Sequence, residues 1–130
     1  MSKNKTVPLH IAEDLGPRFP PKLKKTIKRK WIQALRGKGY KQGTGALARL
    51  DGTMCPIGVA HDLFSDSWWI RDDIAGTWEL KHRTYPLKGG VERLWFANPV
   101  GYFVALYHIA DLNDRGYSFR EIAEYIDRNL

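Results

Sequence analysis

Apolar residues recur at three- and four-residue steps after residue 20, which is the period of an amphipathic helix. In the first such segment the apolar face comprises Leu23, Ile27, Trp31, Ala34 and Leu35. Pro21 suits the first position of a helix, and glycine ends helices readily in the left-handed conformation. The pattern therefore predicts a helix from Pro21 to the glycines at 37 and 39, with Trp31 buried.

Three further helices follow from the same periodicity. Pro56 can open a helix over residues 56–64, and apolar positions continue at helical spacing over 100–113. The last helix has Ser118 as its N-cap and Glu121 three residues on, the pattern of a capping box. These segments predict a protein made mainly of helices.

Strand signals are fewer. The Asp51-Gly52 pair favours a tight turn, which predicts a short hairpin with strands near 46–50 and 53–55. Residues 65–86 show no sustained period, although Trp78, Leu80 and His82 alternate as in a short strand. The fold class we expect is α+β: a mainly helical, small single domain over residues 21–130 with one short antiparallel β-hairpin. Residues 1–20 are interpreted as a flexible basic, proline-rich arm.

The amino-acid composition excludes several classes of protein. The chain has 130 residues, of which 43% are hydrophobic, 27% charged and 12% aromatic, the values of a globular domain rich in aromatic residues. Its single cysteine, Cys55, excludes an internal disulfide and a multi-cysteine zinc or iron–sulfur site within one chain. No apolar run has the length of a bilayer span. We therefore expect a cytoplasmic protein that does not associate with a membrane.

Charge is distributed unevenly along the chain. Residues 1–50 contain 13 Lys and Arg but two acidic residues, and none of the acidic residues falls between 15 and 50. The positive charge of such a segment is neutralised either by an anionic partner or by the acidic remainder of the chain. We expect the partner to be DNA, RNA or a nucleoprotein complex, because Lys and Arg neutralise phosphates. The expected contact residues are Lys25, Arg29, Arg36, Lys38, Lys41 and Gln42.

The glycine-rich segment 37–45 has the composition of an anion-binding loop. It is not a Walker A loop, because Gln42 stands where that motif needs glycine, and the loop follows a helix instead of a strand. We interpret it as a helix end joined to a hairpin, with weaker anion contacts open to Lys38, Lys41 and Gln42.

Several motifs occur in an order that resembles a known group of proteins. These are W-x-x-A-L-R at Trp31, Y-x-Q-G-x-G-x-L at Tyr40, D-G-x-x-C-x-x-G-V-x-x-D-L at Asp51 and L-N-D-x-G-x-S-F-x-x-I-A at Leu112. The chain resembles small proteins of unknown function encoded by phages and prophages, over residues 30–130. The resemblance implies a viral or mobile-element gene, whose product would inhibit a host defence or regulatory system, with a host defence protein as another possible partner.

Two other function classes stay open. A sponge that sequesters a small nucleotide signal would bind it in a pocket formed by Tyr40, Thr44, Trp68 and Trp69. A small enzyme would use His61 or His82 with an acidic cluster, which comprises Asp62, Asp66, Asp72 and Asp73. No serine or cysteine lies in a recognisable nucleophile motif, and no histidine–cysteine spacing matches a metal site. We therefore expect a non-enzymatic binding protein, with no catalytic residues, metal or cofactor.

Overall fold

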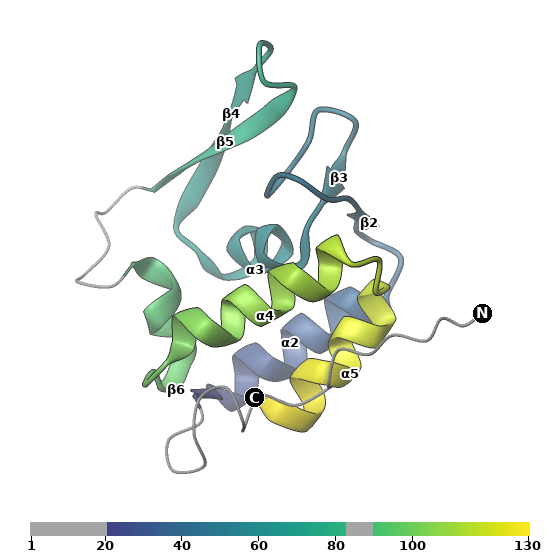
Figure 1. The fold of residues 1–130 in the computed structure, drawn as a ribbon. Helices are drawn as coiled ribbons and strands as arrows, with labels where there is room; N and C mark the ends of the chain where they lie inside the picture. The colour runs from purple at the N-terminus through teal and green to yellow at the C-terminus, as the bar shows by residue number, and fades with distance from the viewer. Residues whose placement is uncertain (1–20, 83–89) are drawn as a thin grey trace.

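The computed structural model describes residues 21–82 and 90–130, so the predicted arm, residues 1–20, lies outside the described residues. The fold is α+β (Figure 1). Its helical elements are α2 (Lys25–Arg36), α3 (Pro56–Phe64), the 3₁₀ helix η1 (Val91–Trp95), α4 (Tyr102–Asp114) and α5 (Phe119–Asn129). The predicted helices over 56–64, over 100–113 and after Ser118 are confirmed, with bounds shifted by at most two residues.

The first helix begins later than predicted. Residues Lys22–Leu23 form a short strand, β1, which pairs in antiparallel fashion with β6 (Phe96–Asn98). The backbone N–H of Leu23 donates to the carbonyl of Leu130 at 3.1 Å. Because these backbone groups bond to distant segments, the chain turns into α2 only at Lys25.

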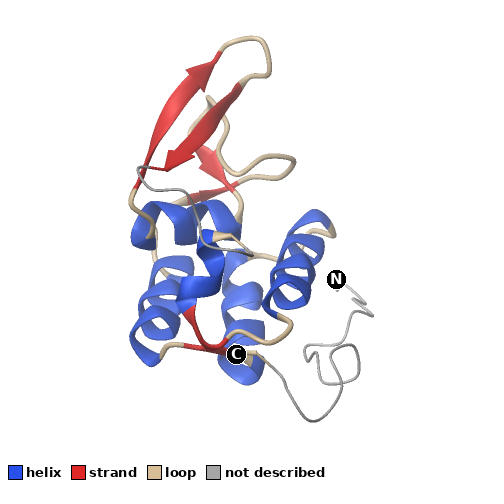
Figure 2. Cartoon of the chain, turned by 90° about the vertical axis from the view of Figure 1, so that its left-hand side faces the viewer, coloured by secondary structure: helices blue, strands red, loops and turns tan. Residues whose placement is uncertain are grey.

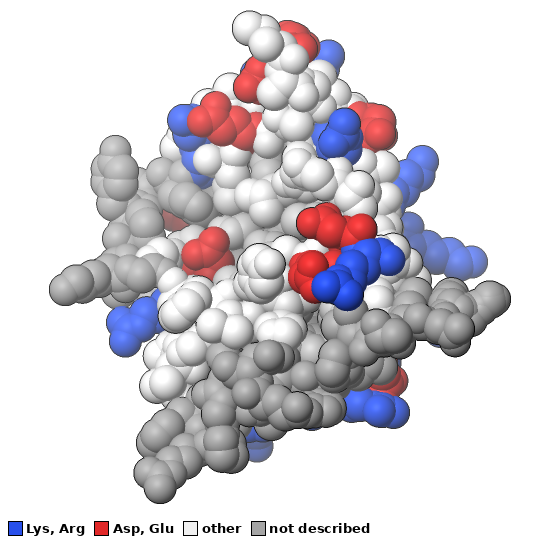
Figure 3. All heavy atoms as spheres, in the orientation of Figure 1, with Lys and Arg blue, Asp and Glu red and all other residues white. Residues whose placement is uncertain are grey.

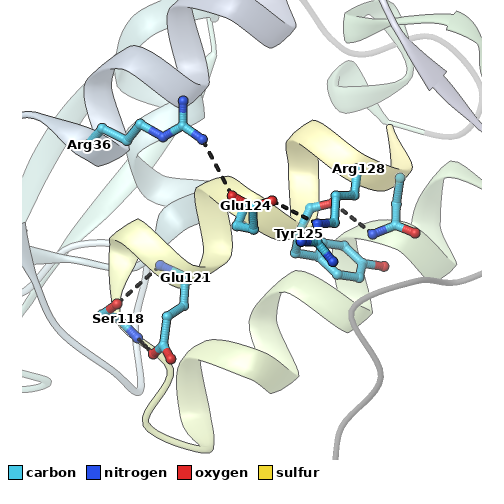
Figure 4. Close-up of polar contacts among 7 residues, drawn as sticks. Arg36, Ser118, Glu121, Glu124, Tyr125 and Arg128 are labelled. Atoms are coloured by element: carbon cyan, nitrogen blue, oxygen red, sulfur yellow. Dashed lines mark hydrogen bonds and ion pairs between the residues drawn. The ribbon is translucent and has the colours of Figure 1, made fainter.

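The capping residues predicted from the sequence can be compared with the helix ends in the structure. Gly37 follows α2 as predicted, but its backbone is extended (φ −87°, ψ −166°) and not left-handed. Ser118 Oγ accepts from the N–H of Glu121 at 3.1 Å, and Glu121 Oε1 accepts from the N–H of Ser118 at 2.9 Å, which confirms the capping box (Figure 4). At α3, Cys55 Sγ accepts from the N–H of Gly58 at 3.4 Å.

A continuous apolar core lies among the helices. Trp31 is fully buried, as predicted, and its indole N–H donates to the carbonyl of Pro56 at 3.0 Å. Its ring meets that of Trp95 edge to face, with centroids 6.1 Å apart. The other large, fully buried apolar side chains in the described part are Tyr125, Ile109, Leu112, Ile122, Ile126, Leu130 and Val59. These contacts bind α2, α3, α4 and α5 into one helical region.

Apart from β1 and β6, which lie beside the helices, the strands form a separate region that extends away from the helices (Figure 2). Two long strands, β4 (Ser67–Asp72) and β5 (Thr77–His82), make an antiparallel hairpin. Two short strands, β2 (Lys41–Gln42) and β3 (Thr53–Met54), pair in parallel. The alternation at Trp78, Leu80 and His82 is therefore confirmed as a strand.

The hairpin predicted around Asp51-Gly52 is confirmed in part. The turn itself forms, because Asp51 Oδ1 accepts from both the backbone N–H and the hydroxyl of Thr53. Arg49 N donates to the carbonyl of Thr53 at 2.8 Å, Cys55 N donates to the carbonyl of Leu47 at 3.1 Å, and an antiparallel bridge joins Ala48 to Met54. Residues 46–50 do not form a regular strand, however, and the regular strand partner of β3 is β2, in parallel. That pairing needs glycine at 43, since a Cβ there would lie 2.3 Å from Thr53 Oγ1. The long antiparallel hairpin is β4–β5.

Residues 48–50 connect the two pairs of strands. Trp78 N donates to the carbonyl of Ala48 at 3.0 Å, and Leu50 N donates to the carbonyl of Gly76 at 3.1 Å. Arg49 thereby bridges Thr77 of β5, while its neighbour Ala48 bridges β3. Backbone hydrogen bonds of this segment therefore link the β2–β3 pair to the β4–β5 hairpin.

Candidate functional site

An open groove of about 690 Å³ runs between α2 and α5, and we call it the basic groove. The charged residues that line it are Lys25, Lys28, Arg29 and Arg36 of α2 and Asp127 of α5. The lining thus has four cations against one anion. The face drawn in Figure 3 differs, because there charges of both signs are scattered and uncharged atoms cover much of the centre.

Helical periodicity explains why these cations lie together. The spacing from Lys25 through Lys28 and Arg29 to Arg36 keeps them on one side of α2. The adjacent side carries Trp31 and Leu35, which are buried in the core. Burial of the apolar side therefore fixes the rotation of the helix, and that rotation directs the cations toward the groove.

Ion pairs hold one end of the basic groove. Arg36 Nη2 lies 3.8 Å from Glu124 Oε1 on α5, and both side chains are partly exposed. The other carboxylate oxygen of Glu124 accepts from Arg128 Nε at 2.7 Å (Figure 4). The carboxylate of Glu124 thus lies between two arginines at the surface where α5 packs beside α2.

The structure brings together only part of the predicted anion-binding set. Lys25, Arg29 and Arg36 line the basic groove, together with Lys28, which the sequence pattern did not distinguish from its neighbours. Lys38 and Lys41 are exposed but follow the end of α2, outside the described lining of the groove. A helical projection that included Lys28 would have found it, because it lies one turn after Lys25 and one turn before Ile32.

Gln42, which was predicted to contact an anion, instead forms hydrogen bonds within the chain. Its amide nitrogen donates to Asn113 Oδ1 and to the carbonyl of Tyr117, both at 2.7 Å, and its amide oxygen accepts from the N–H of Phe119 at 3.0 Å. Asn113 Nδ2 donates in turn to the carbonyl of Gly43 at 2.8 Å. Both hydrogens of the Gln42 amide are therefore used within the chain, and the Y-x-Q-G and L-N-D-x-G-x-S-F motifs meet in this network.

The residues predicted for a nucleotide pocket divide into two groups. Tyr40 Oη donates to Asp62 Oδ2 at 2.7 Å, and Trp69 Nε1 donates to Asp62 Oδ1 at 3.2 Å, so Asp62 joins them. Trp68 lies on the other face of β4 and is 43% exposed, and Thr44 is exposed and contributes its carbonyl to a bond from an arginine. Partial burial, together with the hydrogen bond to Asp62 and its charge, raises the pKa of Tyr40 to about 12.

The predicted acidic cluster does not converge on one point. Asp72 closes the β4–β5 turn by accepting from the N–H groups of residues 74 and 75. Asp73 pairs with Arg71 at 2.6 Å, and both are exposed. Asp66 is exposed where α3 leads into β4, and Asp62 lies on α3 itself. The carboxylates therefore serve separate local contacts.

Of the two histidines predicted for an enzyme, the structure describes the side chain of His61. His61 is buried, with Nδ1 2.9 Å from Ser65 Oγ and Nε2 2.9 Å from Glu92 Oε2. Its ring packs edge to face on Trp95 at 4.8 Å. Both ring nitrogens are engaged, and the contact ties α3 to η1. His82 ends β5, and its side chain lies outside the described part of the chain.

The structure also bears on the cysteine, on a metal site and on a membrane span. Burial raises the pKa of the Cys55 thiol, which keeps the group protonated at neutral pH. Within residues 21–82 and 90–130, no three His, Cys, Asp or Glu side chains gather in a way that could hold a metal ion. In the same ranges, no helix combines the length and apolar character needed to cross a bilayer.

Comparison with known proteins gives a match to a family model. No curated protein and no solved structure matches the chain. Residues 23–89, about half of the chain, match a family of domains, and this stretch contains the cations of the basic groove, Tyr40, Asp62 and the β4–β5 hairpin. The chain therefore belongs to the family described as Domain of unknown function (DUF8296).

Proposed function

We propose that this protein is a non-enzymatic accessory protein of phage type that binds nucleic acid, free or within a nucleoprotein complex, through the basic groove. The observation that carries the proposal is the lining of that groove, four cations from α2 against Asp127. The order of sequence motifs supports a phage origin, and with it a role in the host cytoplasm against a defence or regulatory system.

The dimensions of the basic groove suit a nucleic-acid backbone. The helix α2 has 12 residues, and at 1.5 Å per residue it is about 18 Å long. One strand of a duplex carries roughly five phosphates over that length. Four cations on this scale can neutralise several neighbouring phosphates and release their counterions, which is the main source of sequence-independent affinity.

The uncharged part of the lining indicates how the nucleic acid is read. The uncharged residues are Ile32, Gln33 and Gly37, and no aromatic side chain appears among the described residues that line the groove. Trp31, on the same helix, is buried in the core. Because the groove has no aromatic platform for unpaired bases among these residues, it favours the backbone of a duplex. We therefore expect little preference for particular bases.

Fluorescence anisotropy with a labelled DNA duplex at low salt tests the proposal. The groove pair, Lys25→Ala/Arg29→Ala, should weaken binding about tenfold, because two phosphate contacts are lost. The off-groove pair, Lys24→Ala/Lys30→Ala, removes the same charge from the same segment and should weaken binding much less. Equal losses in the two pairs, or no binding by the wild type, would refute the groove as the binding surface.

A gain of affinity offers a second test. Asp127 is the acidic residue of the lining, and Asp127→Asn removes its repulsion of phosphate while preserving the shape of the side chain. We expect duplex binding to tighten by a few fold at low salt and the gain to disappear as salt screens the charge. Unchanged affinity in this variant would show that the backbone does not approach α5.

A further inference from the structure

A second hollow lies between the β4–β5 hairpin, the loop before β3 and α3. Its volume is about 340 Å³, near the lower end of the range of small-ligand pockets, ~300–1000 Å³. Trp69 and Trp78 line it from the hairpin, Asp62 from α3 and Arg49 from the loop. This tryptophan pocket therefore combines two indoles, a carboxylate and a guanidinium.

The pairing register places the two indoles on one face. Trp69 stands opposite Leu80 and Trp78 stands opposite Arg71, so the two tryptophans are diagonal neighbours across the hairpin. Both are half-buried, and the bond from Trp69 Nε1 to Asp62 holds one ring in its orientation. Two tryptophans on one face offer a flat apolar wall to which a planar heterocycle can stack.

The charged groups of the tryptophan pocket can bind more than they do within the chain. Each oxygen of Asp62 accepts one hydrogen bond, from Tyr40 or Trp69, and each has a second lone pair. Arg49 Nη1 donates to the carbonyl of Thr44 at 3.1 Å, which uses one of the five N–H groups of the guanidinium. A carboxylate accepts from base amines, and a guanidinium binds phosphate.

We propose that the tryptophan pocket binds a mononucleotide whose base carries an exocyclic amine. The base stacks on Trp69 and Trp78, its amine donates to Asp62, and the phosphate binds Arg49. A methylated ammonium, the other ligand of aromatic cages, fits less well because Arg49 repels a cation. Among the described residues, the pocket shares no lining residue with the basic groove, so this binding activity is separate from the proposed function.

Titration with guanosine monophosphate, followed by NMR of the tryptophan indole N–H signals, tests the assignment. The signals of Trp69 and Trp78 should shift in a saturable way, each identified by a Trp→Phe variant. Trp78→Leu should abolish saturable binding. Trp68→Leu, on the opposite face of β4, is the matched control and should bind like the wild type. Thermal unfolding of both variants shows whether they are folded.

The polar contacts are tested with exposed or conservative variants. Arg49→Ala should weaken guanosine monophosphate about tenfold, through the lost charged hydrogen bond, and should leave the binding of guanosine unchanged. Uridine monophosphate should bind more weakly than guanosine monophosphate, because uracil has no exocyclic amine. The groove pair, Lys25→Ala/Arg29→Ala, should bind guanosine monophosphate normally.

Three results would overturn the assignment. The first is the absence of any indole shift in the wild type, and the second is equal binding by wild type and Trp78→Leu. The third is a shift with choline but none with guanosine monophosphate, which would make the pocket an ammonium cage. None of these results depends on whether the basic groove binds a duplex.

Discussion

The tryptophans of the helical region and those of the hairpin have opposite environments. Trp31 and Trp95 are buried among the helices, where they contact each other. Trp68, Trp69 and Trp78 lie on the β4–β5 hairpin, where Trp68 is 43% exposed and the other two are half-buried. The described apolar core contains residues of β1, β6 and the helices but none of the hairpin.

This difference separates the tryptophans that stabilise the fold from those whose surface stays accessible. Burial of large aromatic side chains stabilises the helical region, since the gain follows the apolar area removed from water. The hairpin keeps indole surface accessible, which costs stability and leaves that surface available to a ligand. The basic groove belongs to the helical region, where the buried side of α2 sets the position of its cations.

Tryptophan truncation gives the largest expected contrast. Trp31→Ala should lower the free energy of unfolding by about 3–5 kcal/mol, because it leaves a cavity in the core and removes the bond to Pro56. Trp68→Ala should cost about 1 kcal/mol or less, as for most surface substitutions. Denaturant unfolding measures both. If the two losses are similar, the hairpin contributes to stability as much as the helical core does.

Gln42 tests how the two regions are coupled. Gln42→Ala leaves the N–H of Phe119 and the buried amide oxygen of Asn113 without their partner, and should cost about 1–3 kcal/mol. Hydrogen exchange at the Phe119 amide should accelerate. Gln33→Ala, an exposed glutamine of α2, is the control and should change neither quantity. Slow exchange in Gln42→Ala would mean that α5 is held without this network.

A smaller effect is expected from the pH dependence of Tyr40. Its pKa of about 12 in the folded protein lies above the ordinary value of 10.0. Between these values the unfolded chain has lost the proton that the folded protein keeps, so stability falls as pH rises from 10 to 12. Tyr40→Phe should show a shallower decline over that range in denaturant unfolding. An unchanged decline would show that the surroundings of Tyr40, including Asp62, do not raise its pKa.

Local patterns predicted the helical region well. The capping box at Ser118, the proline opening α3 and the apolar face with Trp31 each depend on residues within a few positions, and all three hold. The late start of α2 could not be predicted this way, since β1 pairs with a strand more than seventy residues away. Its two residues carry no signal of their own.

The β4–β5 hairpin, the basic groove and the tryptophan pocket could not be predicted in full, because they depend on contacts that sequence periodicity does not show. In β4 the run Trp68, Trp69, Ile70 places apolar side chains on both faces and so hides the alternation of a strand. Three of the four groove cations of α2 were identified from the sequence, but their grouping with Asp127 requires the packing of α5. Likewise, the tryptophan pocket joins Arg49 and Trp78 through a bridge between distant segments.

The salt dependence of duplex binding tests the central claim most directly. Each cation that contacts a phosphate adds about one unit to the slope of log Kd against log salt concentration. For the groove pair, Lys25→Ala/Arg29→Ala, we predict a slope lower than that of the wild type by about two. The off-groove pair, Lys24→Ala/Lys30→Ala, should keep the wild-type slope. The same reduction in both pairs would contradict the account, because binding would then follow the net charge of the chain and not the basic groove.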